Sequence, residues 1–430
     1  MNRNESLYSL AHAGVVDLAI VGGGATGLGV ALDAALRGYS VALMESHDFA
    51  GGTSSRSTKL LHGGVRYLAQ GNVSLVREAL HERQSILAIA PHLAAPLSFV
   101  MPAYAWWKLP FYTIGLKLYD LLAGRAGLGA TEWLSRRETA QALPGVQVRG
   151  LHGGVKYWDA QFDDARLALA IARTARAAGA NVLNHVKVAN LQALEGQSDG
   201  AKWALDWQNQ KGVEQGVLRA KCVVNAAGVW VDDVLAKVNG HVPTRRMVTP
   251  SQGVHLVVDR RFLAGKSALL VPKTTDGRVL FAVPWLGSLI LGTTDTVRDD
   301  APREPLPLEE EIDFILREAA HVLADAPQRA DVRSVWVGLR PLVSPSSQKA
   351  TRSISREHTI VVSDQGLVTV TGGKWTTYRA MATDVMAQIG SARLLPSKPI
   401  VRTDEHQLVG SGQPSGSDLT EAPGLHLFGD

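Results

Sequence analysis

A glycine-rich loop near the start of the chain has the residue types and spacing needed to bind a pyrophosphate. The loop covers residues 22–29 and follows an apolar segment, residues 17–21, that is predicted to be a buried strand; a helical pattern follows it. Gly22 permits the tight turn, Gly24 lets a phosphate approach backbone without a Cβ atom, and Gly27 lets helix and strand pack closely. The helix N-terminus offers N–H groups and a positive dipole end to phosphate. The loop therefore predicts a bound dinucleotide.

An acidic residue follows at the distance expected for such a site. The next predicted strand, residues 40–44, ends at Glu45, roughly twenty residues beyond the loop. A carboxylate in that position can accept hydrogen bonds from the adenosine ribose hydroxyls. The pattern favours a cofactor without a 2′-phosphate and leaves both FAD and NAD open.

Composition bounds the class of protein. The chain has 430 residues, which exceeds the usual size of one hydrophobic core, so two domains are expected. With 44 basic and 40 acidic residues the formal net charge is +4, and no basic block with interleaved aromatic residues predicts nucleic-acid binding. The single cysteine, Cys222, excludes an intramolecular disulfide framework and a cysteine-based metal cluster, and no metal site is predicted.

The ends of the chain and its apolar runs bear on localisation. Residues 1–14 lack a signal-peptide pattern and are expected to form a disordered lead-in. No run of 18 uncharged apolar residues predicts a spanning helix. Surface attachment stays open, because residues 96–122 are rich in aromatics and carry the tryptophans Trp106 and Trp107. Past Pro110, the apolar residues form one helical stripe, which suits either packing on the protein's own core or contact with a membrane surface.

The remaining pattern predicts an α/β fold in which the chain alternates between two domains. Short strands follow a helix at residues 164–178, and a buried strand ends in the small residues 225–228, Asn-Ala-Ala-Gly. Hairpins between residues 247 and 294 predict an antiparallel second domain. A further hairpin, residues 359–371, leads into Gly372 and Gly373 at the start of a helix, which suits a second contact with the cofactor.

Four motifs together resemble the FAD-dependent glycerol-3-phosphate dehydrogenases of the aerobic, quinone-linked type. They are the loop at residues 22–29, the run from Ser57 to Leu68 (STKLLHGGVRYL), residues 337–342 (VGLRPL) and residues 372–378 (GGKWTTY). The resemblance covers roughly residues 15 to 390. It implies a Rossmann-like FAD-binding domain with an inserted antiparallel-sheet substrate domain. Members of the family normally carry a further C-terminal helical domain, which is expected to be absent or barely begun in this sequence.

The expected domain limits follow from the resemblance and the periodicity together. They are a discontinuous FAD-binding domain over residues 15–95, 150–240 and 355–392, an apolar and aromatic helical segment over 96–149, a substrate domain over 241–354, and a flexible tail or truncated C-terminal domain over 393–430.

The resemblance also implies an activity. It is oxidation of sn-glycerol 3-phosphate to dihydroxyacetone phosphate by hydride transfer from C2 to the flavin N5, with electrons passed to quinone. The protein is then expected in the cytoplasm, peripherally attached to the inner face of the cytoplasmic membrane. Oxygen as acceptor, the oligomeric state (a homo-oligomer included) and the competence of the shortened chain stay open.

This chemistry needs a base for the hydroxyl proton and cations for the phosphate dianion. Among His62, His255 and Arg340, we favour His255 as the base, with Arg340 stabilising developing negative charge because arginine stays protonated. His62 suits a substrate role, a flavin contact or a purely structural loop position equally well. The phosphate candidates are Arg66, Tyr67, Lys374 and Arg356.

The expected FAD contacts come from the four motifs and the small residues after the buried strand. Hydroxyls of the run after Gly52 are expected on the flavin ring or pyrophosphate, although plain turns use the same residues. The full set is Gly22, Gly24, Ala25, Thr26, Gly27, Glu45, Thr53, Ser54, Ser55, Thr58, Lys59, Leu61, His62, Gly63, Ala227, Gly228, Gly373, Lys374 and Thr376.

Two alternatives remain. The first is a related flavin oxidase or dehydrogenase acting on a 2-hydroxy acid or an amino acid, since the same cations could bind a carboxylate. The second is a non-catalytic flavin-binding protein that lacks the C-terminal domain.

Overall fold

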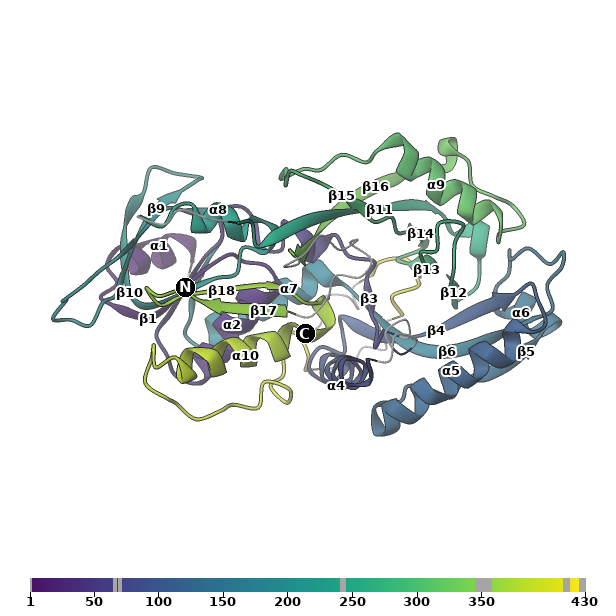
Figure 1. Ribbon diagram of the computed structural model, residues 1–430, viewed down its shortest axis with the longest axis horizontal. Helices are drawn as coiled ribbons and strands as arrows, with labels where there is room; N and C mark the ends of the chain where they lie inside the picture. Colours follow the sequence, from purple (N-terminus) through teal and green to yellow (C-terminus); the bar gives the residue numbers. More distant parts are fainter. Residues whose placement is uncertain are drawn as a thin grey trace.

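The computed structural model describes residues 2–64, 68, 72–239, 245–344, 358–412 and 418–424. Its strands form two mixed sheets lying side by side, the first around β1 and the second around β4, β6 and β11 (Figure 1). The strands of the first sheet are β1 (Val16–Val21), β2 (Val41–Met44), β7 (Asn181–Leu183), β8 (Val186–Ala193), β9 (Trp203–Asn209), β10 (Gln215–Asn225), β17 (His358–Val362) and β18 (Leu367–Gly372).

The second sheet collects strands from distant parts of the chain. Its members are β3 (Leu60–Leu61), β4 (Ala94–Ala103), β5 (Glu132–Ser135), β6 (Gly153–Phe162), β11 (Val248–Asp259), β12 (Ala268–Val271), β13 (Leu280–Trp285), β14 (Ser288–Gly292), β15 (Thr296–Val297) and β16 (Ser334–Val343). The helices are α1 (Arg3–Ala11), α2 (Ala25–Leu36), α4 (Val73–Ile89), α5 (Lys108–Ala123), α6 (Arg136–Ala142), α7 (Asp164–Ala177), α8 (Val231–Leu235), α9 (Glu309–Ala320) and α10 (Tyr378–Ser391).

The first sheet has the expected Rossmann-like core. Strands β7, β2, β1, β10 and β18 run parallel, and β17 closes one edge as an antiparallel hairpin with β18. Successive residues of β1 face opposite sides, as in any strand: Leu18 and Ile20 pack with helices α2, α7 and α10, whereas Ala19 and Val21 pack beneath β8 and β9. The sheet is therefore buried on both faces, which explains its continuous apolar runs.

The second sheet is also covered on both faces. Residues of α9, including Ile315 and Ala319, pack on one side of it. Residues of α4 and α5, including Leu80 and Leu116, pack on the other. Two of its pairings extend over ten residues of register: β4 with β6, and β11 with β16, the latter from Val248 opposite Val343 to Val257 opposite Ser334. This pair carries several residues of the candidate site.

The N-terminal expectation is wrong. Residues 3–11 form α1, which begins with a capping box between Asn2 and Glu5 and buries Leu7 and Leu10 against the β8–β9 side of the first sheet. This short, mostly polar helix gains its stability from packing against the sheet, which a local view of the sequence does not reveal.

The expected domain limits also need correction. Strands β4 and β5 lie within or at the edge of residues 96–149, which were expected to be helical; the helices there are α5, α6 and a short 3-10 helix, Gly124–Ala126. Strands β3 and β6 were assigned to the FAD-binding domain but pair within the second sheet, where β6 lies between β4 and β3. Apolar runs of this length do not distinguish a strand from a buried helix, and pairing of distant strands decides the matter.

The described parts of residues 393–430 are not a flexible tail. Leu395 and Leu408 are buried in the core around α2 and α10, and Leu408 N–H donates to Ile89 O at 3.0 Å. Further on, Leu419 O accepts from Leu286 N–H at 2.8 Å in the β13–β14 turn. This segment is held against both halves of the molecule by single buried leucines and by backbone hydrogen bonds. Neither leaves a periodic pattern in the sequence, so the packing was not predicted.

The apolar stripe of α5 faces solvent, so the core-packing interpretation is wrong. Phe111, Ile114 and Leu121 are 72%, 71% and 76% exposed, while Leu116 and Tyr119 on the opposite side are buried. Trp106 and Trp107, just before the helix, are 71% and 60% exposed. No helix among the described residues combines the length and apolar character needed to cross a bilayer.

Candidate active site

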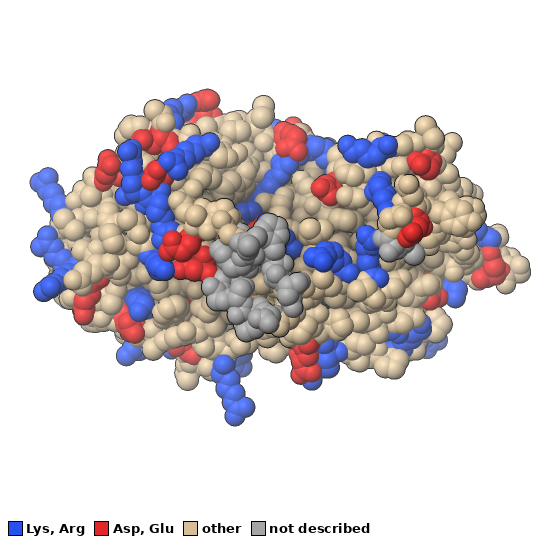
Figure 2. All heavy atoms as spheres, turned by 180° about the vertical axis from the view of Figure 1, so that it is seen from behind, with Lys and Arg blue, Asp and Glu red and all other residues tan. Residues whose placement is uncertain are grey.

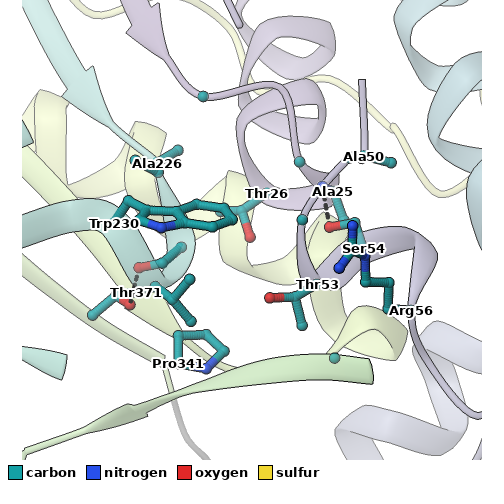
Figure 3. Close-up of a pocket in the computed structure, with 18 of the residues that line it drawn as sticks. Ala25, Thr26, Ala50, Thr53, Ser54, Arg56, Ala226, Trp230, Pro341 and Thr371 are labelled. Carbon is teal, nitrogen blue, oxygen red and sulfur yellow. Dashed lines mark hydrogen bonds between the residues drawn. The ribbon is translucent and has the colours of Figure 1, made fainter. Parts of the chain in front are cut away.

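A cavity of about 960 Å³ lies between the two sheets and is lined by residues from both. That volume is at the upper end of the range for small-molecule sites. Seen from behind, the surface is hollowed between the two halves of the molecule, with basic side chains reaching into the hollow (Figure 2). The close-up shows Thr26 and Ala25 at the start of α2 facing Thr53, Trp230 and Pro341 across the space (Figure 3).

The glycine loop forms one wall of the cavity. A Cβ atom on Gly22 would lie 2.6 Å from Ala226 O, and one on Gly27 would lie 2.0 Å from Gly22 O, so neither position accepts a larger residue without backbone movement. Gly24 caps α2 without a side-chain hydrogen bond, and the first turn has no acidic residue. The positive end of α2 therefore faces the cavity, as an anion site requires. Ser54 Oγ accepts from Ala25 N–H at 3.0 Å and links the next motif to this wall.

The nucleoside end of the cavity lies past β2. Glu45 accepts hydrogen bonds from Gly23 N–H and His47 N–H, both at 2.8 Å, which hold its carboxylate at the cavity edge. Trp230 lines the same cavity; its indole N–H donates to Ala301 O at 2.7 Å, and the Arg303 guanidinium lies 3.8 Å from its ring centroid. Carboxylate, aromatic face and cation together suit a ribose and a base.

The other end of the cavity is built where three motifs meet. Thr53 donates to Leu339 O on β16, and the indole of Trp375 donates to Ser54 O at 2.7 Å. Gly372 and Gly373 both have positive φ values, 81° and 73°, which favour glycine. These contacts draw the segments around residues 53–58, 339 and 372–376 together.

His255 on β11 lies at this end. Its Nε2 atom is 2.8 Å from the Thr58 hydroxyl oxygen, and its ring stacks on Trp336 at 5.2 Å between centroids. Burial, followed by the nearby charges of Arg340 and Lys59, holds the pKa of His255 well below its ordinary value of 6.5. The ring is therefore neutral at physiological pH and able to accept a proton.

Arg340 lies on β16, and its guanidinium extends over Gly253 of the neighbouring strand β11, two residues before His255. Its guanidinium donates to Thr294 O at 3.0 Å and Thr293 Oγ1 at 3.2 Å, and lies 3.4 Å from Asp295. A Cβ atom on Gly253 would lie 2.5 Å from Arg340 Nη2, so the guanidinium occupies space that only a glycine at that position leaves open. Arg340 is thus rigidly held against the cavity that it lines.

Most of the site residues predicted from sequence meet at this cavity. Those on its wall are Gly22, Gly24, Ala25, Thr26, Glu45, Thr53, Ser54, Thr58, His62, Ala227, Gly228, His255, Arg340, Gly373, Lys374 and Thr376. Arg66, Tyr67 and Arg356 lie outside the described residues.

Five predicted cofactor contacts do not line the cavity and have structural roles instead. Lys59 Nζ pairs with Asp164 at 2.5 Å and donates to Ser55 O at 2.8 Å. Leu61 is fully buried in the core, and Gly63 N–H donates to the Tyr119 hydroxyl at 3.0 Å. Ser55 contributes the carbonyl that Lys59 binds, and Gly27 packs on Gly22, as described above.

Several cavity residues were missed. Arg56 lies between the predicted contacts Ser55 and Thr58 and pairs with Glu304 at 2.8 Å, so a basic residue at this place in the sequence was a usable signal. Trp230 follows the small residues after β10 closely and was also within reach. Nothing in the sequence near Arg303 or Gly253 indicates that they reach the site.

The model of the FAD-dependent oxidoreductase family matches residues 17–379. The chain belongs to this family. It is 44% identical over 397 residues to the mitochondrial glycerol-3-phosphate dehydrogenase of Mus musculus, covering 90% of this chain and 54% of the relative. The mitochondrial enzyme of Arabidopsis thaliana is 42% identical over 424 residues, with 95% of this chain and 66% of the relative covered.

A solved structure agrees with the sequence relatives. The glycerol-3-phosphate dehydrogenase of Bacillus halodurans, determined with FAD, superposes with a TM-score of 0.74 at 32% identity, covering 96% of this chain and 71% of that one. The resemblance to FAD-dependent glycerol-3-phosphate dehydrogenases and the choice of FAD over NAD are confirmed. The chain spans about half the length of the mammalian mitochondrial relatives it matches.

The cavity fits FAD on its own chemistry. The glycine cradle and the open N-terminus of α2 suit the pyrophosphate, Glu45 suits the ribose, and the cavity is long enough to draw its walls from both sheets. In the part of the chain that the structure describes, no cluster of His, Cys, Asp or Glu side chains is arranged to hold a metal ion.

Proposed function

We propose that this chain carries the site at which sn-glycerol 3-phosphate is oxidised to dihydroxyacetone phosphate with FAD as cofactor. The observation that carries the proposal is the pairing of a buried His255, 2.8 Å from the Thr58 hydroxyl, with a fixed Arg340 in the same cavity as the glycine cradle. Bound FAD supplies the acceptor for the two electrons of the alcohol. The polypeptide must therefore bind the phosphate, orient the alcohol and take up its proton.

The proton-accepting group is His255. Its Nε2 atom faces the hydroxyl of Thr58, which itself lines the cavity, so Thr58 connects the substrate hydroxyl to the imidazole. The lowered pKa keeps the ring in the form that accepts a proton. Arg340, held by the carbonyl of Thr294, places permanent positive charge beside the oxygen on which negative charge develops.

The phosphate of the substrate requires cations at the same end. Lys374 and the unpredicted Arg56 both line the cavity. Charge-assisted hydrogen bonds to such groups contribute about 1.5–3 kcal/mol each. We include Arg66, Tyr67 and Arg356 in the proposed phosphate set on the basis of the sequence motifs alone.

The substrate assignment is tested by comparing donors with one preparation of the holoprotein and an artificial electron acceptor. We expect turnover with sn-glycerol 3-phosphate and little with 2-hydroxyglutarate or glycine. Glycerol serves as the control for the phosphate, because it keeps the alcohol and removes the dianion. Activity confined to one of the acids would refute the proposal.

We further propose that electrons pass to membrane quinone, with the chain held peripherally on the inner face of the cytoplasmic membrane. The support is the stripe of α5 (Phe111, Ile114, Leu118 and Leu121), which is exposed along the helix and continues to two exposed tryptophans. Tryptophan combines a large apolar surface with a polar N–H group, which suits it to the boundary between lipid and water.

A further inference from the structure

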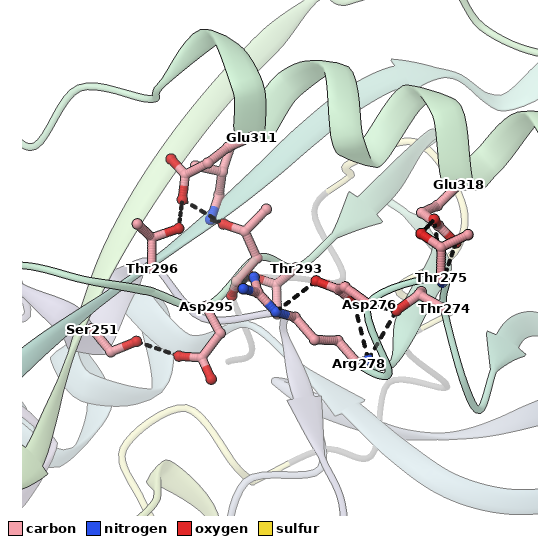
Figure 4. Close-up of polar contacts among 12 residues, drawn as sticks. Ser251, Thr274, Thr275, Asp276, Arg278, Thr293, Asp295, Thr296, Glu311 and Glu318 are labelled. Atoms are coloured by element: carbon pink, nitrogen blue, oxygen red, sulfur yellow. Dashed lines mark hydrogen bonds and ion pairs between the residues drawn. The ribbon is translucent and has the colours of Figure 1, made fainter. Parts of the chain in front are cut away.

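Helix α9 carries two buried glutamates that do not line the cavity. Glu311 and Glu318 are 5% and 4% exposed, and each accepts a hydrogen bond from a threonine hydroxyl (Figure 4). Neither is explained by the proposed function. The two glutamates differ in the further contacts that their threonine partners make.

Glu311 accepts four hydrogen bonds, two at each oxygen. Oε1 accepts from the hydroxyls of Thr294 and Thr296 at 2.8 and 2.7 Å. Oε2 accepts from Gln252 Nε2 at 2.6 Å and from Leu308 N–H at 3.1 Å. The carboxylate therefore accepts from β11, the turn after β14, β15 and the start of its own helix.

A single residue, Thr294, connects Glu311 to Arg340 through hydrogen bonds. Val254 N–H donates to Thr294 Oγ1 at 3.0 Å, and the hydroxyl of Thr294 in turn donates to Glu311. The carbonyl of the same threonine accepts from Arg340 Nη1 at 3.0 Å. The neighbouring residue, Thr293, holds Nη2 of the guanidinium. Glu311 is thus hydrogen-bonded to the turn that holds the Arg340 guanidinium.

We propose that Glu311 is a positioning residue for Arg340. It fixes the turn at residues 293–295, and this turn fixes the guanidinium beside His255. The inference rests on the role given to Arg340 in the proposed function. Glu318 is not part of this chain of contacts, because its partner Thr275 lies in the turn between β12 and β13 and does not touch Arg340.

An amide fits the position of the Glu311 carboxylate less well. If the nitrogen of a glutamine took the place of Oε2, it would face two donors, Gln252 Nε2 and Leu308 N–H. If it took the place of Oε1, the hydroxyls of Thr294 and Thr296 would have to turn from donors into acceptors, and the Thr294 proton would lose the acceptor that it has in the wild type. If the side-chain amide of Gln252 flipped so that its oxygen faced the new glutamine, its NH₂ group would face Arg298, which donates to Gln252 Oε1 at 2.8 Å in the wild type. Two donors would then face each other at that position.

The first test compares Glu311→Gln with the matched control Glu318→Gln in stopped-flow reduction of the bound flavin. We expect Glu311→Gln to slow reduction about 10- to 100-fold, the range for a displacement of order 1 Å. The FAD content and the substrate concentration for half-maximal rate should change little. Glu318→Gln should stay within about twofold of wild type. Equal effects of the two variants would overturn the proposal.

The second test is a double-mutant cycle with Arg340→Lys. If Glu311 acts through the guanidinium, Glu311→Gln should add little to the loss already caused by Arg340→Lys. Additive losses would mean a general structural role and would contradict the inference. If Glu311→Gln does not fold, Thr294→Val and its conservative partner Thr294→Ser replace it, and only the valine variant should slow reduction.

Hydrogen exchange separates this inference from the proposed function, because it needs no substrate. Glu311→Gln should speed amide exchange in residues 292–296 and 338–342, and Glu318→Gln should speed it only around residues 274–276. Failure of wild-type flavin to be reduced by sn-glycerol 3-phosphate would sink the proposed function and leave this comparison intact. Unchanged exchange at residues 292–296 would sink the inference.

Discussion

Replacing Gly253 by alanine should displace Arg340 without altering any polar group of the site. The added methyl would lie 2.5 Å from Arg340 Nη2 and 2.8 Å from Thr293 Oγ1. Non-bonded carbon contacts are favourable near 3.5–4.0 Å, so the guanidinium must retreat by about 1 Å. Its bonds to Thr294 O and Thr293 Oγ1 resist this movement.

The expected loss follows from that displacement. A misplacement of about 1 Å costs on the order of 100-fold in rate, which corresponds to about 2.7 kcal/mol of barrier. Overpacking of this kind lowers folding stability by about 1–3 kcal/mol as well, so thermal unfolding is measured beside the kinetics. FAD should remain bound, because the methyl meets only Arg340 and Thr293 among its nearest neighbours.

The assay is anaerobic stopped-flow reduction of the flavin by sn-glycerol 3-phosphate at saturating concentration. Gly115→Ala on α5 is the control, because a Cβ atom there meets nothing within 4 Å. This control should reduce at the wild-type rate and gain up to about 1 kcal/mol of stability from better helix propensity. A folded, yellow Gly253→Ala protein that is reduced within about threefold of wild type would refute the role given to Arg340.

Three further predictions concern the base, the cation and the apolar stripe. Because burial lowers the pKa of His255 below 6.5, unfolding takes up a proton below that pH, and the free energy of unfolding falls there by up to about 1.4 kcal/mol per pH unit. His255→Asn should remove this part of the pH dependence, as measured by urea unfolding at pH 7.5, 6.0 and 5.0. An unchanged pH dependence would contradict the prediction. Arg340→Ala should reduce the flavin reduction rate at least 100-fold with FAD retained, which absorbance at 450 nm and stopped flow check together; unchanged kinetics would remove Arg340 from the mechanism. Joint replacement of Trp106 and Trp107 by serine should weaken flotation with anionic liposomes about 100-fold, since each tryptophan loses about 1.4 kcal/mol of apolar burial, whereas serine at the exposed Leu306 should not weaken it; equal flotation of the two variants would contradict a membrane role for the stripe.

The parts of the fold that local chemistry dictates were predictable from the sequence. The unit formed by β1, the glycine loop and α2 follows from a short apolar run, glycines at fixed spacing and a helical pattern, and the structure places it as expected. The hairpins β13–β14 and β17–β18 follow from alternation and turn residues. Each of these signals lies within about twenty residues of the chain.

Features set by distant partners were not predictable. Lys59 sits in a motif in which most residues are predicted cofactor contacts, yet it pairs with Asp164, 105 residues away, because a buried carboxylate at the start of α7 needs a cation. Strands β4 and β6 join the second sheet through pairing that no local pattern encodes. The stripe on α5 was visible as an amphipathic pattern, but periodicity does not say whether a stripe faces core or solvent.

The central claim is that one cavity holds FAD and the oxidisable substrate together. Its most direct test is to add sn-glycerol 3-phosphate to the purified yellow protein without oxygen and to record the flavin absorbance near 450 nm. The account predicts that the band bleaches, and that dihydroxyacetone phosphate forms in equal amount to the reduced flavin. A flavin that stays oxidised with sn-glycerol 3-phosphate, but is bleached by a 2-hydroxy acid or an amino acid, would contradict it.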